Sequence, residues 1–238
     1  MLLRRLKRKI KLQKDINMNT VIAILIIVTG SSKMKSGDQT GVWLEEYAVP
    51  YMKFKEAGYK VTVASINGGK IPIDPASLDA KKHEWKEAIE VLENATKLKS
   101  IKTQAYQAVY VPGGHGAMFD LADDATVKAI LAEFADSNKI VSAICHGPAA
   151  LVDVKLKNGD YLVKGKTLTS FTNNEEDEAQ KSDKMPFMLE TKLKAQGATF
   201  EAKENWANHV VVDGNLITGQ NPFGSASIAD AIIKSLEK

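Results

Sequence analysis

The sequence predicts an α/β fold, a mostly parallel sheet with helices on both of its faces. Short apolar runs alternate with amphipathic stretches from residue 21 to residue 154, which is the order of a parallel sheet built from strand–helix units. The runs are rich in β-branched residues, as buried parallel strands are. The two motifs that stand out for chemistry, at Gly113 and Cys145, each directly follow such a run, where sites in these sheets lie.

The first elements follow from apolar periodicity and from turn residues. Gly58 ends the first helix, in which Pro50 marks a kink or an irregular start. The glycines and prolines of 68–75 indicate a long loop after the second strand. The predicted strands are 21–28, 59–64, 108–111 and 139–144, and the predicted helices are 41–57, 85–98, 125–137 and one that begins at 148.

The later part of the chain is more mixed. We expect a hairpin at 161–168, a helix at 186–196 that Gly197 closes, and a final helix at 226–236. A second hairpin is expected at 210–218, because Asp-Gly between apolar runs is a strong hairpin signal.

One domain is predicted over residues 18–238, after a basic extension of residues 1–17. The extension holds seven Arg and Lys and no acid before residue 15, so the net charge of +3 does not indicate a nucleic-acid partner. A basic segment before the apolar run 21–28 also suggests a signal peptide. The run is short and β-branched, and no cleavage site follows, so we interpret it as a strand. No run is long enough to span a membrane, and we expect a cytoplasmic protein.

The single cysteine, Cys145, excludes a disulfide within the chain. A buried strand leads into it, and the small residues Ala143 and Gly147 lie two positions before and after it, as in a nucleophile elbow. Pro148 suits the first turn of a helix, whose positive end would favour the thiolate. The alternative is a buried structural cysteine.

The second motif, Pro-Gly-Gly-His-Gly at 112–116, also follows a strand. Its backbone N–H groups at Gly114 or His115, together with that of His146, are candidates for an oxyanion hole and substrate contacts. No Gly-Lys-Ser/Thr follows, so the motif is not a phosphate-binding P-loop.

Seven segments in order carry a family resemblance. The chain resembles the ThiJ/PfpI branch of the class I glutamine-amidotransferase-like superfamily, and within it the glutathione-independent glyoxalase and stress-chaperone group. The resemblance implies a flavodoxin-like sandwich with a cysteine nucleophile elbow. The matching segments are 40–46, 57–69, 110–121, 143–151, 170–176, 186–190 and 218–226.

The resemblance implies a nucleophile, a neighbouring histidine and a glutamate from a later loop. These are Cys145, His146 and Glu176, with Glu175 as the alternative glutamate. Without the resemblance, the acidic run from Glu175 to Asp177 is typical of a solvated loop.

A separate acid that tunes the thiol is also implied. It is Glu46, with Glu45 as the alternative, and two adjacent residues of a helix point to different faces, so at most one of them can reach the site. Such an acid raises the thiol pKa when charged, but stabilises the thiolate by a hydrogen bond when protonated.

We predict no metal and no cofactor. His83 and Glu84 form an adjacent pair on a charged helix, which is typical of a surface, and metal signatures need more widely spaced ligands. The relatives are commonly dimers, which implies a homodimer.

The predicted activity is that of a glyoxalase III (D-lactate dehydratase), which converts methylglyoxal or glyoxal to a hydroxy acid through a cysteine hemithioacetal. Three alternatives stay open. One is a cysteine peptidase, amidohydrolase or protein deglycase, and another is a glutaminase, which would need a synthetase partner. The third is a holding chaperone or redox sensor, which would need an exposed apolar surface or an accessible thiol of low pKa.

Overall fold

The computed structural model describes residues 21–78 and 83–238, so the basic extension 1–17 lies outside the described residues. A central sheet contains seven strands: β1 (Ala23–Ile27), β2 (Lys60–Ser65), β3 (Thr96–Lys97), β4 (Ala108–Val111), β5 (Ile140–Ile144), β8 (Val210–Asp213) and β9 (Leu216–Gly219). Their order is β3-β2-β1-β4-β5-β9-β8. Every neighbouring pair is parallel except β8 and β9, which form an antiparallel edge.

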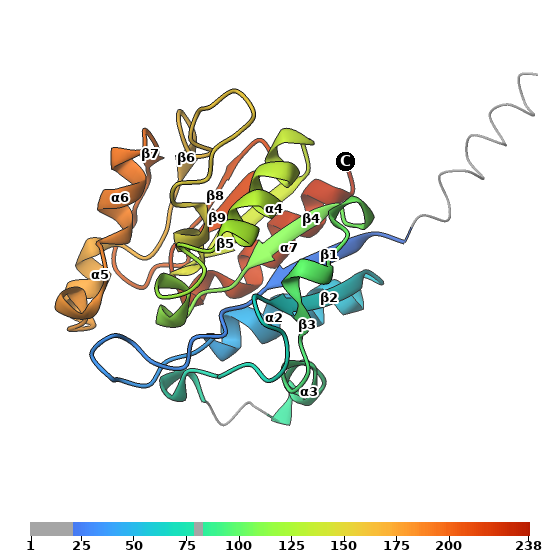
Figure 1. Cartoon of the computed structure of the whole chain (residues 1–238), viewed down its shortest axis with the longest axis horizontal. Coiled ribbons are helices and arrows are strands. Elements are labelled where there is room, and N and C mark those ends of the chain that lie inside the picture. The colour runs from blue at the N-terminus through green and yellow to red at the C-terminus, as the bar shows by residue number, and fades with distance from the viewer. Residues whose placement is uncertain (1–20, 79–82) are drawn as a thin grey trace, which may run out of the picture.

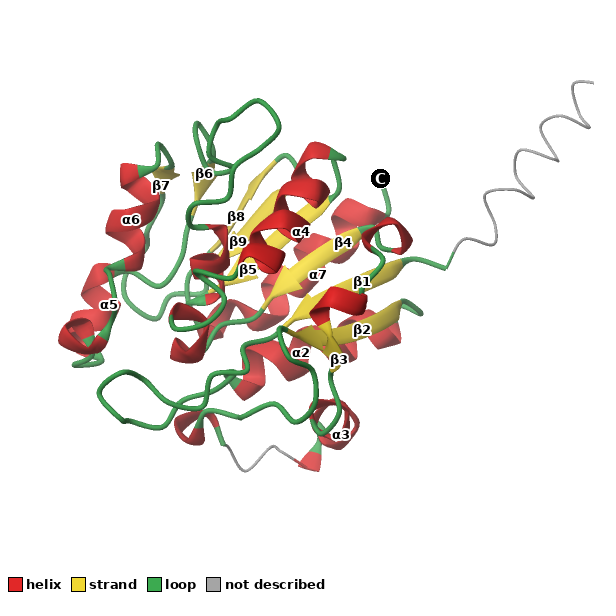
Figure 2. Cartoon of the chain, in the orientation of Figure 1, coloured by secondary structure: helices red, strands yellow, loops and turns green. Residues whose placement is uncertain are grey.

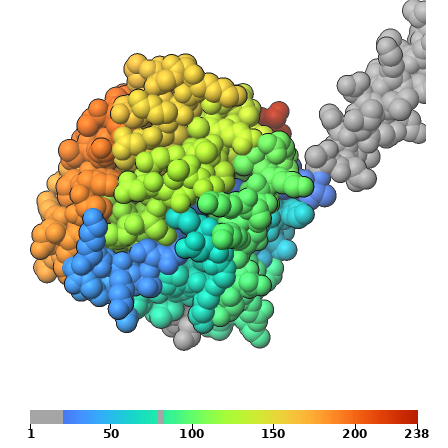
Figure 3. Space-filling view, viewed as in Figure 1, coloured from blue at the N-terminus to red at the C-terminus, as the bar shows by residue number. Residues whose placement is uncertain are grey.

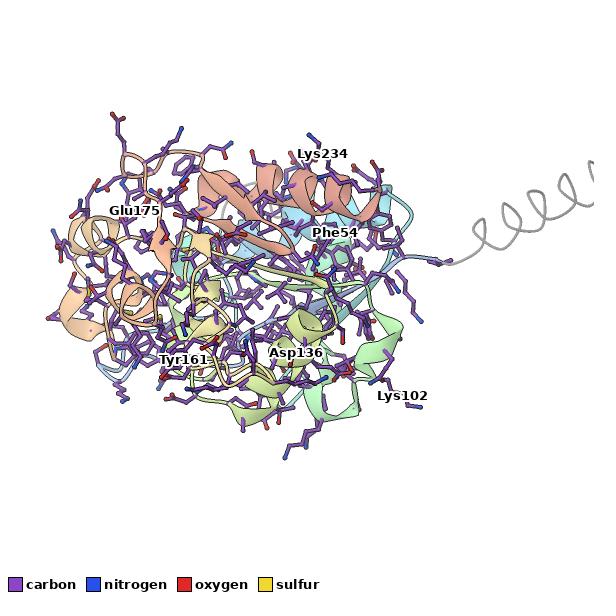
Figure 4. The ribbon with its side chains drawn as sticks, turned by 90° about the horizontal axis from the view of Figure 1, so that it is seen from above. Phe54, Lys102, Asp136, Tyr161, Glu175 and Lys234 are labelled. Atoms are coloured by element: carbon purple, nitrogen blue, oxygen red, sulfur yellow. The ribbon has the colours of Figure 1, made fainter. Side chains whose placement is uncertain are left out.

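Helices cover both faces of this sheet (Figures 1 and 2). The α-helices are α2 (Leu44–Glu56), α3 (Lys86–Leu92), α4 (Ala125–Asp136), α5 (Asn173–Glu178), α6 (Leu189–Ala195) and α7 (Ser225–Leu236). Seen from above, Lys234 of α7 and Asp136 of α4 lie on opposite sides of the molecule (Figure 4). The predicted α/β sandwich with a mostly parallel sheet is therefore confirmed.

The residues of β1 explain why both faces must be covered. Ile24 and Ile26 pack into a core with α2, α3 and α7, whereas Leu25 and Ile27 pack into a second core with α4. Successive side chains of a strand point to opposite faces, so an uninterrupted apolar strand buries both. Full burial of each such side chain contributes about 1.5–3 kcal/mol.

The segment beyond β5 adds a smaller unit at one end of the molecule. There β6 (Thr167–Leu168) pairs in parallel with β7 (Thr199–Phe200), and α5 and α6 lie beside them (Figure 1). The loop before α2 meets this unit on the surface in Figure 3. Lys184 of this unit pairs with Asp38 of the loop at 2.9 Å. Among the described residues, no helix has the length and apolar character needed to cross a membrane.

Two predicted elements are wrong. The helix expected over 85–98 ends at Leu92, because Ala95 exchanges two backbone hydrogen bonds of 2.8 Å with Gly69, and Thr96–Lys97 then joins the sheet as β3. The hairpin expected at 161–168 does not form, because its second half pairs with the distant β7. Both errors arise from contacts between residues far apart in sequence.

A third difference concerns the helix expected from Pro148. The chain forms only a short 3-10 helix, η6 (Gly147–Leu151). The hairpin of β8 and β9 and the final helix α7 agree with the prediction.

Candidate active site

A strained turn places Cys145 at the carboxyl end of β5. Its φ angle is +58°, a left-handed conformation that costs a non-glycine residue about 1–3 kcal/mol. The turn is held on both sides: the Cys145 N–H donates to the Gly219 carbonyl and the Phe171 N–H donates to the Cys145 carbonyl, each at 2.9 Å. The central position of β5, between β4 and β9, thus fixes where the thiol points.

Two glycines let three segments converge around this turn. A Cβ on Gly147 would lie 2.2 Å from the Val111 carbonyl oxygen, so no larger residue fits beneath the elbow. A Cβ on Gly113 would lie 2.5 Å from Glu46 Oε2 and 2.8 Å from the His146 nitrogen. Glycine at these positions is therefore a steric requirement of the site.

A chain of contacts runs from the thiol to a buried carboxylate. Cys145 Sγ lies 3.3 Å from His146 Nδ1, and His146 Nε2 lies 2.6 Å from Glu176 Oε2. All three residues are buried. Phe171 packs on the His146 ring with centroids 4.5 Å apart, which restrains the imidazole.

Glu176 also contacts a second histidine. His115 Nε2 lies 2.9 Å from Glu176 Oε1, and the His115 and His146 rings pack 4.0 Å apart. Burial alone would raise the pKa of Glu176, but the charge of His146 and the hydrogen bonds of His115 and His146 hold it below its usual range. An ionised carboxylate only accepts hydrogen bonds. Both histidines therefore donate from Nε2, and the other ring nitrogen of His146, Nδ1, faces the thiol.

His115 also contacts Glu176, but its pKa is lowered, whereas a histidine paired with a carboxylate on the surface has a raised pKa. Burial, followed by the neighbouring His146, lowers the pKa of His115 to about 3. His115 is therefore neutral, and its Nδ1 is buried without a hydrogen-bond partner among the described residues.

Glu46 lies on the other side of the thiol. The Gly113 N–H donates to its Oε2 at 2.7 Å, whereas its buried Oε1 makes no hydrogen bond of ordinary geometry among the described residues. Burial raises the pKa of Glu46 to about 8, against the lowering effects of Cys145 and the Gly113 N–H. The carboxyl is thus mostly protonated at neutral pH.

Burial and then the Glu46 carboxyl raise the pKa of the Cys145 thiol well above its usual range, and only the His146 backbone N–H lowers it. The sequence predicted the opposite, a thiolate favoured by a helix end. The difference has a structural reason: η6 is a five-residue 3-10 helix, which lacks the aligned turns that produce a helix dipole.

A cavity of ≈ 170 Å³ lies against Cys145, His146, Gly114 and His115. Its remaining walls are mostly apolar, and Lys181 is the one charged side chain among its lining residues. The apolar part is formed by Trp43, Ala76, Phe171, Ala179, Trp206 and Pro222. Such a pocket fits a small organic substrate with few polar groups.

Three side chains beside the cavity have the donor atoms of a metal site. Ligand-type atoms of His115, His146 and Glu176 all lie within 4.8 Å of one another. The sequence showed no cluster of metal-type ligands, and these three residues are separated by about thirty positions each.

Comparison with known proteins places this geometry in a family. The family model described as DJ-1/PfpI matches residues 39–235. The chain belongs to the DJ-1/PfpI family. The resemblance stated from the sequence is thereby confirmed.

Several relatives of this DJ-1/PfpI protein carry glyoxalase names. Glutathione-independent glyoxalase hsp3102 of Schizosaccharomyces pombe is 31% identical, over 84% of this chain and 90% of the relative. Glyoxalase 3 of Candida albicans is 28% identical, over 91% of this chain and 99% of the relative. The crystal structure of glyoxalase III from Candida albicans matches with a TM-score of 0.80 and 27% identity, over 91% of this chain and 98% of that one.

The fold brings most of the predicted site residues together. Cys145, His146 and Glu176 are in contact, and Glu46 and Gly114 lie beside them. The open alternatives separate clearly by position: Glu45 is exposed, whereas Glu175 is buried but faces away from the thiol chain. His83 is exposed.

Sequence reasoning missed the side chain of His115, for which only the backbone N–H was considered. It also missed the role of Glu175, whose Oε1 accepts hydrogen bonds from Trp206, Gln220 and Asn221 at 2.8–3.0 Å. A signal existed for the second: Thr-x-x-Glu at 172–175 is a capping-box pattern, and the structure forms that box.

Proposed function

We propose that this DJ-1/PfpI protein is a glutathione-independent glyoxalase, which converts methylglyoxal or a related 2-oxoaldehyde to the hydroxy acid. The observation that carries the proposal is the chain Cys145–His146–Glu176 at the wall of a small, mostly apolar cavity. The glyoxalase names of relatives that match most of their length support it.

In the first step, His146 Nδ1 takes the proton of the Cys145 thiol, and Sγ attacks the aldehyde carbon. A base is needed because the thiol pKa is raised, so the resting cysteine is not ionised. The C–O double bond becomes an alkoxide, and the imidazolium is stabilised by the ionised Glu176 at 2.6 Å. The alkoxide then takes the proton from the His146 imidazolium, which gives the hemithioacetal and returns His146 to its basic form.

In the second step, His146 moves a proton between neighbouring carbons. It removes the hydrogen of the former aldehyde carbon, and a proton adds to the adjacent ketone oxygen, which gives an enediol. The second carbon then takes the proton from His146 while the hydroxyl of the first carbon loses its proton, which gives a thioester of the hydroxy acid. Water then cleaves the thioester and releases the acid and the thiol, so one water is consumed and no electrons leave the substrate.

Backbone N–H groups stabilise the oxygen that becomes negative. The His146 N–H faces the sulfur of Cys145, and Gly114 and His115 line the same cavity. Donors fixed in a low-dielectric cavity stabilise a developing charge without reorganisation. Protonated Glu46 supplies one more neutral donor near the thiolate.

The same thiol chemistry also suits peptide or amide hydrolysis, but the cavity of ≈ 170 Å³ favours a small carbonyl compound. A redox sensor is less favoured, because Cys145 is 3% exposed and its pKa is raised.

We further propose a cytoplasmic homodimer. Sedimentation of the full chain tests the dimer, and cell fractionation tests the location.

The test is the loss of methylglyoxal and the appearance of lactate without glutathione. The wild-type chain is expected to turn over, whereas Cys145→Ala and His146→Ala lose activity. Asp177→Asn is the matched control, because Asp177 is exposed beside Glu176. Unchanged lactate formation by Cys145→Ala would overturn the proposal.

A further inference from the structure

We propose that His115, His146 and Glu176 form a binding site for a zinc-class divalent cation, and that the bound cation inhibits the enzyme. The binding stands on the geometry alone, whereas the inhibition rests on the proposed function.

The three donors come from separate segments that meet at one point. His115 begins the 3-10 helix η5 (His115–Met118), His146 precedes η6, and Glu176 lies in α5. Their side chains are 1–6% exposed. Two imidazoles and one carboxylate are a common ligand set for zinc and its neighbours.

The present distances are close to those of a coordination shell. Glu176 lies 2.9 Å from His115 Nε2 and 2.6 Å from His146 Nε2. Two ligands of a tetrahedral zinc, each about 2.0–2.1 Å from the metal, lie about 3.3 Å apart. Insertion of the cation therefore needs each of these two histidine–glutamate pairs to separate by less than about 1 Å, and ligand atoms of the two histidines lie within 4.8 Å of each other.

A metal takes each ligand atom in its deprotonated form. Coordination through Nε2 therefore places the single ring proton of each histidine on Nδ1. Two of the three residues line the cavity, which provides a route of entry.

Charge near the site limits the affinity. Lys181 lines the same cavity and would repel a cation. Glu46 offers no compensating charge while its carboxyl is protonated. We therefore expect Lys181 to weaken binding, and Lys181→Met to tighten it.

The inhibition follows from the tautomer of His146. With the cation on Nε2, the ring proton is on Nδ1, which faces Cys145 Sγ at 3.3 Å. Nδ1 then has no lone pair for the thiol proton, and the carboxylate no longer supports an imidazolium. Removal of the cation restores both.

Binding is tested on full-length Cys145→Ala, which removes the thiol as a ligand. Titration with ZnCl₂ against a chromophoric chelator is expected to show one tight site per chain, weakened ~100-fold by His115→Gln. His83→Gln is the matched control, because His83 is exposed elsewhere on the chain. Circular dichroism verifies that each variant is folded. Co²⁺ added to the wild-type chain should give a four- or five-coordinate visible spectrum without a thiolate charge-transfer band.

Activity is measured separately. Zinc is expected to inhibit wild-type methylglyoxal turnover, EDTA to restore it, and His115→Gln to need ~100-fold more zinc for half-inhibition relative to its own activity. Absence of the tight site in Cys145→Ala, or equal affinity in His115→Gln, would overturn the metal site. Because binding needs no turnover, failure of the glyoxalase proposal would leave this result intact.

Discussion

Two buried carboxyls flank the same thiol, and the structure gives them opposite properties. Glu46 contacts one backbone N–H and apolar surroundings, and its pKa is raised to about 8. Glu176 contacts two imidazoles, and its pKa is held below the usual range despite burial. Burial disfavours the charged form in both cases, so the difference arises from the partners.

The two carboxyls therefore have different roles at the thiol. A neutral Glu46 adds no negative charge beside the sulfur, whereas an ionised Glu176 holds His146 in the tautomer that accepts the thiol proton. Pairs of groups whose environments move their pKa values apart commonly identify acid and base roles.

The largest effect is expected from Glu176→Gln. The neutral amide cannot stabilise an imidazolium, so methylglyoxal turnover should fall by about 10²–10⁴-fold. Steady-state kinetics at pH 7 measure this. Asp177→Asn should leave the rate unchanged, and a loss of less than about threefold in Glu176→Gln would contradict the role of the carboxylate.

The raised pKa of Glu46 should make the stability of the folded protein depend on pH. In the folded protein Glu46 titrates near 8, against 4.5 for an ordinary glutamate. Between these values the folded state holds the extra proton, so the stability that Glu46 contributes is fully present below pH 4.5 and falls as pH rises toward 8. At about 1.4 kcal/mol per pKa unit, the change amounts to several kcal/mol. Urea unfolding at pH 5 and pH 8 measures it, and Glu46→Gln should remove this part of the pH dependence.

Glu175→Gln should act on stability more than on chemistry. Three donors, from half-buried Trp206 and from buried Gln220 and Asn221, share Glu175 Oε1. Glu175 Oε2 completes the helix cap at Thr172. Loss of these charge-assisted bonds should lower the free energy of unfolding by about 1.5–3 kcal/mol. Chemical denaturation measures this, and an unchanged midpoint would show that Glu175 is not a structural support.

The smallest effect is expected from Glu46→Gln on the alkaline side of the activity profile. As Glu46 ionises near pH 8, its charge raises the thiol pKa further, so wild-type turnover should fall above that pH. Glutamine keeps a neutral donor. At a pH about two units above the pKa of Glu46, Glu46→Gln should therefore retain about tenfold more activity than wild type. Glu45→Gln, at an exposed position, should follow the wild-type profile.

The sequence predicted β4 and β5 closely, because their apolar runs are bounded by clear turn residues. It failed at 85–98, where local helix propensity gave way to pairing of Ala95 with Gly69. It also failed at η6, where the chain after Pro148 bends beneath β4 and does not continue as an α-helix. A local sequence pattern predicts an element well when contacts among the element's own residues stabilise it. It predicts poorly when contacts with a distant segment decide the structure.

For the site, the sequence by itself determined the elbow. An apolar strand, a cysteine and flanking small residues dictate a tight turn at a sheet's carboxyl edge, and the family motifs named the histidine and the acidic loops. Only the tertiary structure decided between Glu45 and Glu46 and between Glu175 and Glu176. The packing of α2 and α5 sets which residue of each adjacent pair points into the site. It also placed the His115 side chain on Glu176, a contact between segments 61 residues apart that no local pattern encodes.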